Sequence, residues 1–160
     1  MYYSQKLAII QVMYRKFEEY LNTWRIDSFR IPLIVRGARQ VGKTFIIRQF
    51  GENYFSNYIE VNFDADPEYT LAFSTSKPEE IIAKLEVVFN QRIISGETLV
   101  FLDEIQECPA ALKALRYFKE SCPELHIIAA GSLLEFYLQE QQFSFPVGRI
   151  EFAYLGPMSF

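Results

Sequence analysis

The sequence predicts a three-layer α/β domain, in which helices cover both faces of a mostly parallel sheet. Short apolar runs alternate with helical stretches from Ile31 onward. The runs are continuously apolar, which is typical of parallel strands buried on both faces. A glycine-bearing loop directly follows the first run, at the kind of position where α/β domains bind ligands.

The first element is a helix within residues 1–28. Its apolar residues keep a three-then-four spacing that places them on one helical face: Leu7, Ile10, Tyr14, Phe17, Leu21 and Trp24. The pattern covers too few heptads to favour a coiled coil. We therefore expect residues 1–28 to pack on a core domain formed by residues 29–160.

Strands and helices alternate through that core domain. The expected strands are 31–35, 58–63, 98–102, 126–130 and 150–155. The expected helices run from the glycine-bearing loop through residue 50, over 78–94 and over 109–121, and an acidic loop follows the second strand. Right-handed crossovers put every loop that follows a strand at one edge of the sheet, where we expect the site.

Composition excludes several other classes of protein. Of the 160 residues, 50% are hydrophobic, which is too much apolar surface for a disordered chain. The net charge of −4 does not support a nucleic-acid partner, and no apolar run approaches the length of a membrane span. Cys108, Cys122 and the single His126 are too few for a structural zinc site, so we expect reduced cysteines in a cytoplasmic protein.

The loop after the first strand has the pattern of a phosphate-binding loop. It consists of Gly37, Ala38, Arg39, Gln40, Val41, Gly42, Lys43 and Thr44. The two glycines permit backbone angles that turn successive N–H groups toward a phosphate, and a helix N-terminus follows. Lys43 would reach the β- and γ-phosphates, and the Thr44 hydroxyl would coordinate Mg²⁺. Arg39 is expected to anchor the loop or face solvent.

Two acids, Asp103 and Glu104, follow the strand at 98–102. Asp103 is positioned to hold the Mg²⁺ shell, and Glu104 to polarise an attacking water as a general base. A GTPase should carry an Asn-Lys-x-Asp segment, which this chain lacks, and a small-molecule kinase needs no such glutamate. ATP and Mg²⁺ are therefore the expected cofactors, and ATP hydrolysis is the reaction that fits best.

Two further residues are candidates for catalysis. Ser132 follows the strand at 126–130 and could sense the γ-phosphate or the attacking water, although serine also favours helix N-caps. Arg149 follows a glycine-bearing turn and could stabilise phosphoryl charge, in cis or from a neighbouring subunit. A surface or ion-paired arginine is the alternative.

Four segments in order give the chain a specific resemblance. They are Arg36–Thr44, Phe101–Glu107, Ala129–Leu134 and Phe145–Arg149. Together they resemble the AAA-type P-loop ATPase domain that precedes a C-terminal domain of unknown function in many bacterial and archaeal proteins. The resemblance implies an additional-strand sheet and the roles assigned above to Lys43, Thr44, Asp103 and Glu104. It also implies that Ser132 occupies the sensor position, and that a C-terminal domain is absent from this chain.

Two functions remain open from the sequence. The first is an ATPase that passes energy to a missing domain, a protein partner or a second copy. The second is a nucleotide-binding switch with negligible hydrolysis, whose loops are ordered by the γ-phosphate. A DNA-associated motor is a third possibility that the charge does not support.

Overall fold

A five-stranded sheet forms the centre of the computed structural model, which describes residues 2–37, 42–140 and 148–156. The strands are β1 (Leu33–Arg36), β2 (Asn57–Asn62), β3 (Thr98–Asp103), β4 (His126–Ala130) and β5 (Glu151–Tyr154). Their order is β2-β3-β4-β1-β5, and all neighbouring pairs are parallel. The additional strand β4 lies between β1 and β3, which confirms the expected type of sheet.

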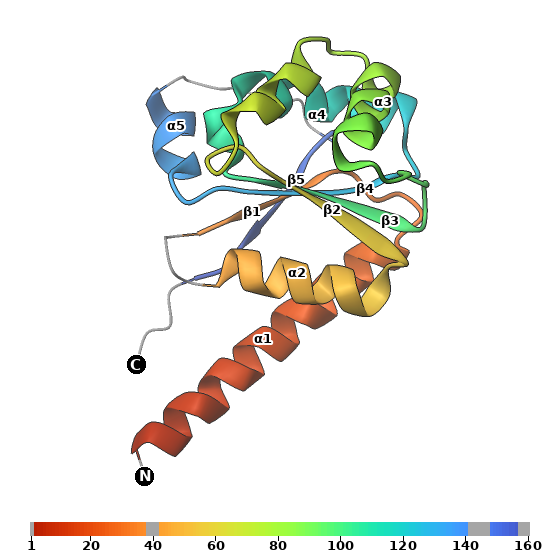
Figure 1. The fold of residues 1–160 in the computed structure, drawn as a ribbon. Coiled ribbons are helices and arrows are strands. Elements are labelled where there is room, and N and C mark those ends of the chain that lie inside the picture. The colour runs from red at the N-terminus through yellow and green to blue at the C-terminus, as the bar shows by residue number, and fades with distance from the viewer. Residues whose placement is uncertain (1, 38–41, 141–147, 157–160) are drawn as a thin grey trace.

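Helices cover both faces of this sheet and complete the predicted three layers (Figure 1). On one face lie α1 (Tyr2–Ile26) and α2 (Lys43–Tyr54). On the other lie α3 (Pro78–Phe89), α4 (Pro109–Ser121) and α5 (Leu134–Glu140). Two short 3₁₀ helices, η1 (Pro67–Phe73) and η2 (Ile105–Glu107), follow β2 and β3.

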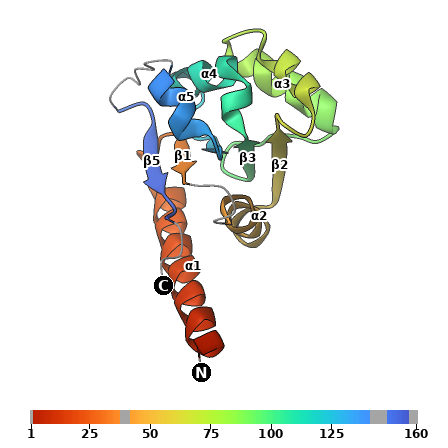
Figure 2. The ribbon, with the colours of Figure 1, turned by 90° about the vertical axis from the view of Figure 1, so that its left-hand side faces the viewer.

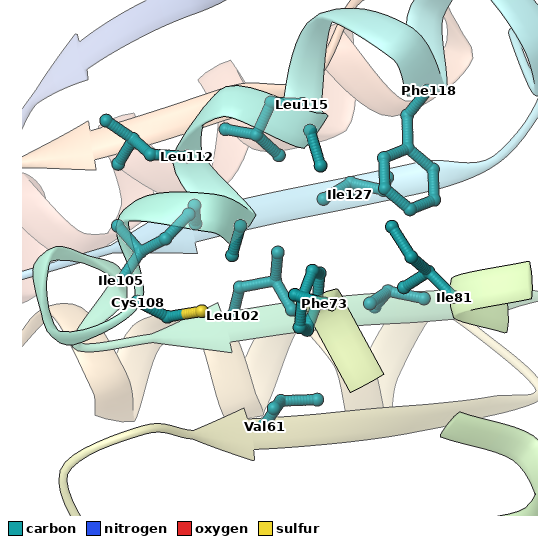
Figure 3. Packing of buried hydrophobic residues seen from close by; sticks show 14 of the residues in the cluster. Val61, Phe73, Ile81, Leu102, Ile105, Cys108, Leu112, Leu115, Phe118 and Ile127 are labelled. Atoms are coloured by element: carbon teal, nitrogen blue, oxygen red, sulfur yellow. The ribbon is translucent and has the colours of Figure 1, made fainter. Parts of the chain in front are cut away.

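The two hydrophobic cores follow from the alternation of side chains along each strand. In β3, Leu99 and Phe101 pack into the core beneath α1 and α2, whereas Val100 and Leu102 pack into the opposite core. Leu112, Leu115 and Phe118 of α4 close that second core over the sheet (Figure 3). Because both faces are buried, every position of β3 and β4 is buried, as continuously apolar strands predict.

The N-terminal helix lies within the expected residues 1–28 but packs over only part of its length. Phe17, Leu21 and Trp24 are buried in the core against α2 and the sheet. Leu7 is 48% exposed, and the first turns of α1 project away from the domain (Figure 2). The prediction that residues 1–28 pack on the core is therefore wrong for the first half of the helix, because its apolar stripe extends beyond the surface that could cover it.

Two other boundaries differ from the prediction. The expected acidic loop after β2 contains η1, which Asp66 caps by accepting a hydrogen bond from the Glu68 backbone N–H at 3.1 Å. Helix α3 ends at Phe89 instead of continuing to residue 94, because Asn90 adopts the left-handed conformation with φ 48° and closes the helix.

An aromatic cluster closes the sheet edge where the strands begin. The Trp24 indole N–H donates to the Ile31 carbonyl at 2.8 Å. The His126 ring lies between Trp24 and Phe55, with edge-on centroid distances of 5.6 and 4.9 Å. Nε2 of His126 lies 3.0 Å from the Arg25 carbonyl, and since a carbonyl only accepts, this nitrogen carries the proton.

Within the described residues, no helix combines the length and apolar character needed to cross a membrane. Cys108 and Cys122 are both unbridged thiols, as expected. A cytoplasmic location stays a prediction.

Candidate functional site

The phosphate loop joins β1 to α2 at the edge where the strands end. Gly42 has φ 90° and ψ 21°, a left-handed conformation that favours glycine, and the Tyr14 hydroxyl of α1 packs against it. Lys43, only 7% exposed, donates from Nζ to the Gly37 carbonyl at 2.7 Å. The other predicted loop residues, Ala38, Arg39, Gln40 and Val41, lie outside the described residues.

Burial sets the electrostatics of Lys43. It lowers the pKa of the ammonium group, while the charges of Glu104 and Asp103 act in the opposite direction. A buried cation of this kind gains from an additional anionic partner. Its place at the start of α2, where backbone N–H groups have no partner within the helix, suits an anion such as a phosphate.

Thr44 and Asp103 come together as the sequence predicts. The Thr44 hydroxyl donates to Asp103 Oδ2 at 2.9 Å, and Asp103 is 3% exposed. Burial raises the pKa of the Asp103 carboxyl, and the hydrogen bonds from Thr44 and from the Glu104 backbone N–H oppose that change. A hydroxyl beside a buried carboxylate supplies the hard oxygen ligands that Mg²⁺ prefers, so these residues fit the expected ion.

Glu104 lies beside this pair in an unusual backbone conformation. Its φ of 53° and ψ of 46° place a non-glycine residue in the left-handed region. Its carboxylate Oε2 accepts hydrogen bonds from Gln106 Nε2 at 2.6 Å and from the Ser132 hydroxyl at 3.0 Å. Ser132, the expected sensor, therefore contacts the expected base, and its role as a sensor stays a prediction.

These side chains surround one cavity of about 350 Å³. Its lining consists of Gly42, Lys43, Thr44, Phe45, Arg48, Glu104 and Ser132. The structure thus gathers residues that follow three different strands, β1, β3 and β4, around a single space. A cation, a hydroxyl and a carboxylate facing one cavity can bind an anionic, metal-chelating ligand and act on it.

A larger cavity of about 610 Å³ lies away from these residues, between η1 and α3. Its walls are mainly apolar and include Leu71, Ala72, Val87 and Val88. Asp66, Glu68 and Lys84 also line it, but no residue of the phosphate loop does. The smaller cavity is therefore the candidate site.

Arg149 is the one predicted site residue of the described chain that lies far from this cavity. It precedes β5, at the edge where the strands begin, and its guanidinium pairs with Glu120 of α4 at 2.8 Å. The phosphate loop lies at the opposite edge, so the proposed cis role is wrong in this arrangement and the ion-paired alternative holds. A role for Arg149 in a neighbouring subunit stays a prediction.

Sequence reasoning missed three residues of the site. Phe45 and Arg48 line the cavity from α2, and Arg48 also makes two 2.7 Å hydrogen bonds to Glu60 of β2. Arg48 lies one helical turn after Thr44, and this spacing could have revealed it. Gln106, which contacts Glu104, follows it by two residues, but no sequence pattern indicated its contact.

The fold and the site together define a P-loop nucleotide-binding domain of the ATPase type. A model of the AAA domain family matches residues 30–160, and the chain belongs to this family. No curated protein matches the chain. Among solved structures, it is similar to PCH-2 of C. elegans, with 13% identity and a TM-score of 0.45. That similarity covers 94% of this chain and 41% of PCH-2, so the chain spans well under half of that protein.

Proposed function

We propose that this domain binds ATP with Mg²⁺ and hydrolyses it to ADP and phosphate. The observation that carries the proposal is the convergence of Lys43, Thr44 and Glu104 on one cavity, with Asp103 held against Thr44 behind it. Phosphoryl transfer needs positioned charge more than covalent chemistry, and these groups supply it. The absence of an Asn-Lys-x-Asp segment favours ATP over GTP.

Each residue has a distinct part in the proposed reaction. Lys43 and the N-terminus of α2 would bind the phosphate oxygens. Thr44 and Asp103 would hold Mg²⁺, which when bound neutralises charge on the phosphate oxygens. Glu104 would orient the attacking water and take its proton, so that the water oxygen forms the new bond to phosphorus and ADP leaves with the old bridging oxygen.

The direct test is steady-state ATP turnover by the chain and by Glu104→Gln, with binding measured in parallel. We expect Glu104→Gln to keep its ATP affinity and to lose turnover by about 10²- to 10⁴-fold, the usual contribution of a general base. Glu107→Gln is the matched control, because Glu107 is exposed in the same short helix η2. Unchanged turnover in Glu104→Gln would remove the assigned base.

Calorimetric titration with ATP and with GTP, each with Mg²⁺, tests the phosphate loop. Lys43→Ala should weaken ATP binding by about 10- to 100-fold, since a hydrogen bond to a charged group contributes about 1.5–3 kcal/mol. Lys113→Ala, an exposed lysine of α4, should bind as the unaltered chain does. ATP binding without measurable turnover would favour the nucleotide switch, with its output passed to a further domain, a partner or a second copy.

A further inference from the structure

We propose that Gln106 is a positioning residue for Glu104, and that Gly131 is required because only glycine leaves room for Gln106. The inference rests on the proposed function, because Glu104 is the base of that reaction. It assigns to Gln106 the task of fixing which oxygen of the Glu104 carboxylate meets the attacking water.

The hydrogen bond from Gln106 to Glu104 fixes the orientation of the amide. Gln106 lies in η2, is 8% exposed and donates from Nε2 to Glu104 Oε2 at 2.6 Å. A carboxylate only accepts hydrogen bonds, so the NH₂ group of Gln106 must face it. The amide oxygen, Oε1, therefore points away from Glu104.

Gly131 receives that amide oxygen. A Cβ atom at position 131 would collide with Gln106 Oε1 and would also lie 3.2 Å from Cδ of Gln106. Any other residue there would push the Gln106 side chain out of its place. A glycine directly after β4 thus controls the position of a side chain that follows β3.

The amide oxygen has no hydrogen-bond partner among the described residues, although it is buried. Burying an unpaired polar atom is unfavourable, and a leucine of similar size would fill the same space without this disadvantage. A role limited to packing therefore does not explain a glutamine here. What the glutamine adds is the donor that contacts Glu104.

The donors contact only one of the two oxygens of the carboxylate. Glu104 Oε2 accepts from Gln106 Nε2, from the Ser132 hydroxyl and, at 3.4 Å, from the Ser132 backbone N–H. Among the described residues, no hydrogen-bond donor contacts Oε1 of Glu104. One oxygen is thus tethered, while the other is left to accept a proton from water. A base held in this way is aligned before the substrate arrives, which is how positioning accelerates a reaction.

Two variants remove the contact by independent routes. Gln106→Leu deletes the donor, and Gly131→Ala displaces it, at little cost to folding because the colliding atom is the end of a flexible side chain. We expect each to lower kcat by about 10- to 100-fold, as displacing a group that orients a reacting residue does. KM for ATP should stay within about twofold, because the interaction acts on the chemical step.

Matched controls separate this effect from general disturbance. Gln49→Leu changes an exposed glutamine of α2, and Gly156→Ala adds a methyl group that would meet only ordinary contacts. Both should keep kcat. The double variant Gln106→Leu/Gly131→Ala should be no slower than either single variant, because both changes remove one interaction. In ¹⁵N spectra, the Gln106 side-chain amide signal should shift in folded Gly131→Ala.

The outcomes separate this inference from the proposed function. If the unaltered chain turns over ATP and Glu104→Gln does not, while folded Gln106→Leu keeps its kcat, the positioning role is wrong and the assigned base stands. Fully additive losses in the double variant would also overturn the inference. Absence of turnover in the unaltered chain would overturn the proposed function and this inference with it.

Discussion

Polar side chains are buried both where the strands of the sheet begin and where they end, but their surroundings differ at these two edges. Where the strands begin, His126 is held between the rings of Trp24 and Phe55, and burial lowers its pKa to about 4, so it is neutral at pH 7. Where the strands end, Lys43 and Asp103 are also buried, yet Lys43 lines a cavity and Asp103 contacts Thr44, which lines it too.

The difference separates an edge that packs the fold together from the edge that carries the candidate site. At the first edge, the Trp24 indole N–H and His126 Nε2 pair with backbone carbonyls, and aromatic rings pack around the imidazole. The second places Glu104 in a left-handed backbone conformation, which costs about 1–3 kcal/mol for a non-glycine residue. Such a backbone conformation persists only because the rest of the fold holds it in place. A bound anion and metal ion would then stabilise the buried charges of this edge.

The largest expected effect concerns the first edge. Trp24→Ala should lower the free energy of unfolding by about 3–5 kcal/mol, because it leaves a cavity where a large buried ring was packed. Urea unfolding measures this loss, and Phe29→Ala, which truncates a residue that is 83% exposed, is the control. If the edges are separate in function, folded Trp24→Ala keeps its ATP affinity. A large loss of ATP affinity would show that the two edges are not separate in function.

The next effect is the pH dependence that His126 gives to stability. Burial is the main cause of its lowered pKa, and the nearby charges of Arg30 and Arg25 act in the same direction. The unfolded chain binds this proton below about pH 6.5, whereas the folded chain does so only near pH 4. Stability is therefore present above pH 6.5 and falls as the pH drops toward 4, by about 2–3 kcal/mol.

Thermal unfolding between pH 7 and pH 4 would check this window. The variant His126→Gln cannot titrate, so its stability should change less over the same range. An equal fall in the variant would assign the pH dependence to other groups.

A smaller effect of opposite sign is expected at the second edge. The pKa of Asp103 is raised by burial, so its ionised form is less favourable in the folded chain than in the unfolded one. Stability from this group is therefore present at low pH and is lost as the pH rises through its folded pKa. Asp103→Asn should raise the free energy of unfolding at pH 7 by about 1 kcal/mol, as is common when a functional constraint is removed.

Melting temperatures without Mg-ATP would measure the gain in stability of Asp103→Asn, and melting temperatures with Mg-ATP would measure its loss of stabilisation by the ligand. The ligand should stabilise the unaltered chain more than Asp103→Asn. The exposed Asp64→Asn serves as the control. A destabilised Asp103→Asn at pH 7 would contradict the prediction.

The smallest effect is expected for Arg149→Ala. Its ion pair with Glu120 joins side chains that are 40% and 46% exposed, and such pairs contribute at most about 1 kcal/mol. We expect nearly unchanged stability and unchanged turnover at low chain concentration. A loss of turnover that appears only as the concentration increases would show that Arg149 acts on a neighbouring subunit.

The sequence was sufficient for those parts of the molecule that depend on local pattern. Short apolar runs identified the five strands of the described residues. The positions of Thr44 after β1 and of Asp103 at the end of β3 predicted that they meet. Parallel strands leave few ways to arrange such loops, which is why this geometry could be inferred.

The remaining features depend on how side chains pack between segments that are far apart in the sequence. Periodicity showed the apolar face of α1 but not that its first turns project from the domain, where Leu7 is 48% exposed. The contact of Gln106 with Gly131 joins two loops through side-chain volume, which no spacing rule describes. Arg149 was misplaced because the turn before it resembles a functional loop, whereas the direction of β5 puts it at the other edge.

The sheet order also has a consequence for how the chain acquires its site. Strand β1, which carries the phosphate loop, pairs with β4 and β5, and both come late in the sequence. During synthesis, β1 and its loop therefore lack their last neighbouring strand until β5 has left the ribosome and paired with β1. Contacts between such distant segments form slowly, because a long stretch of chain must be closed first. The nascent domain should thus acquire its ability to bind nucleotide as one of the last events of folding.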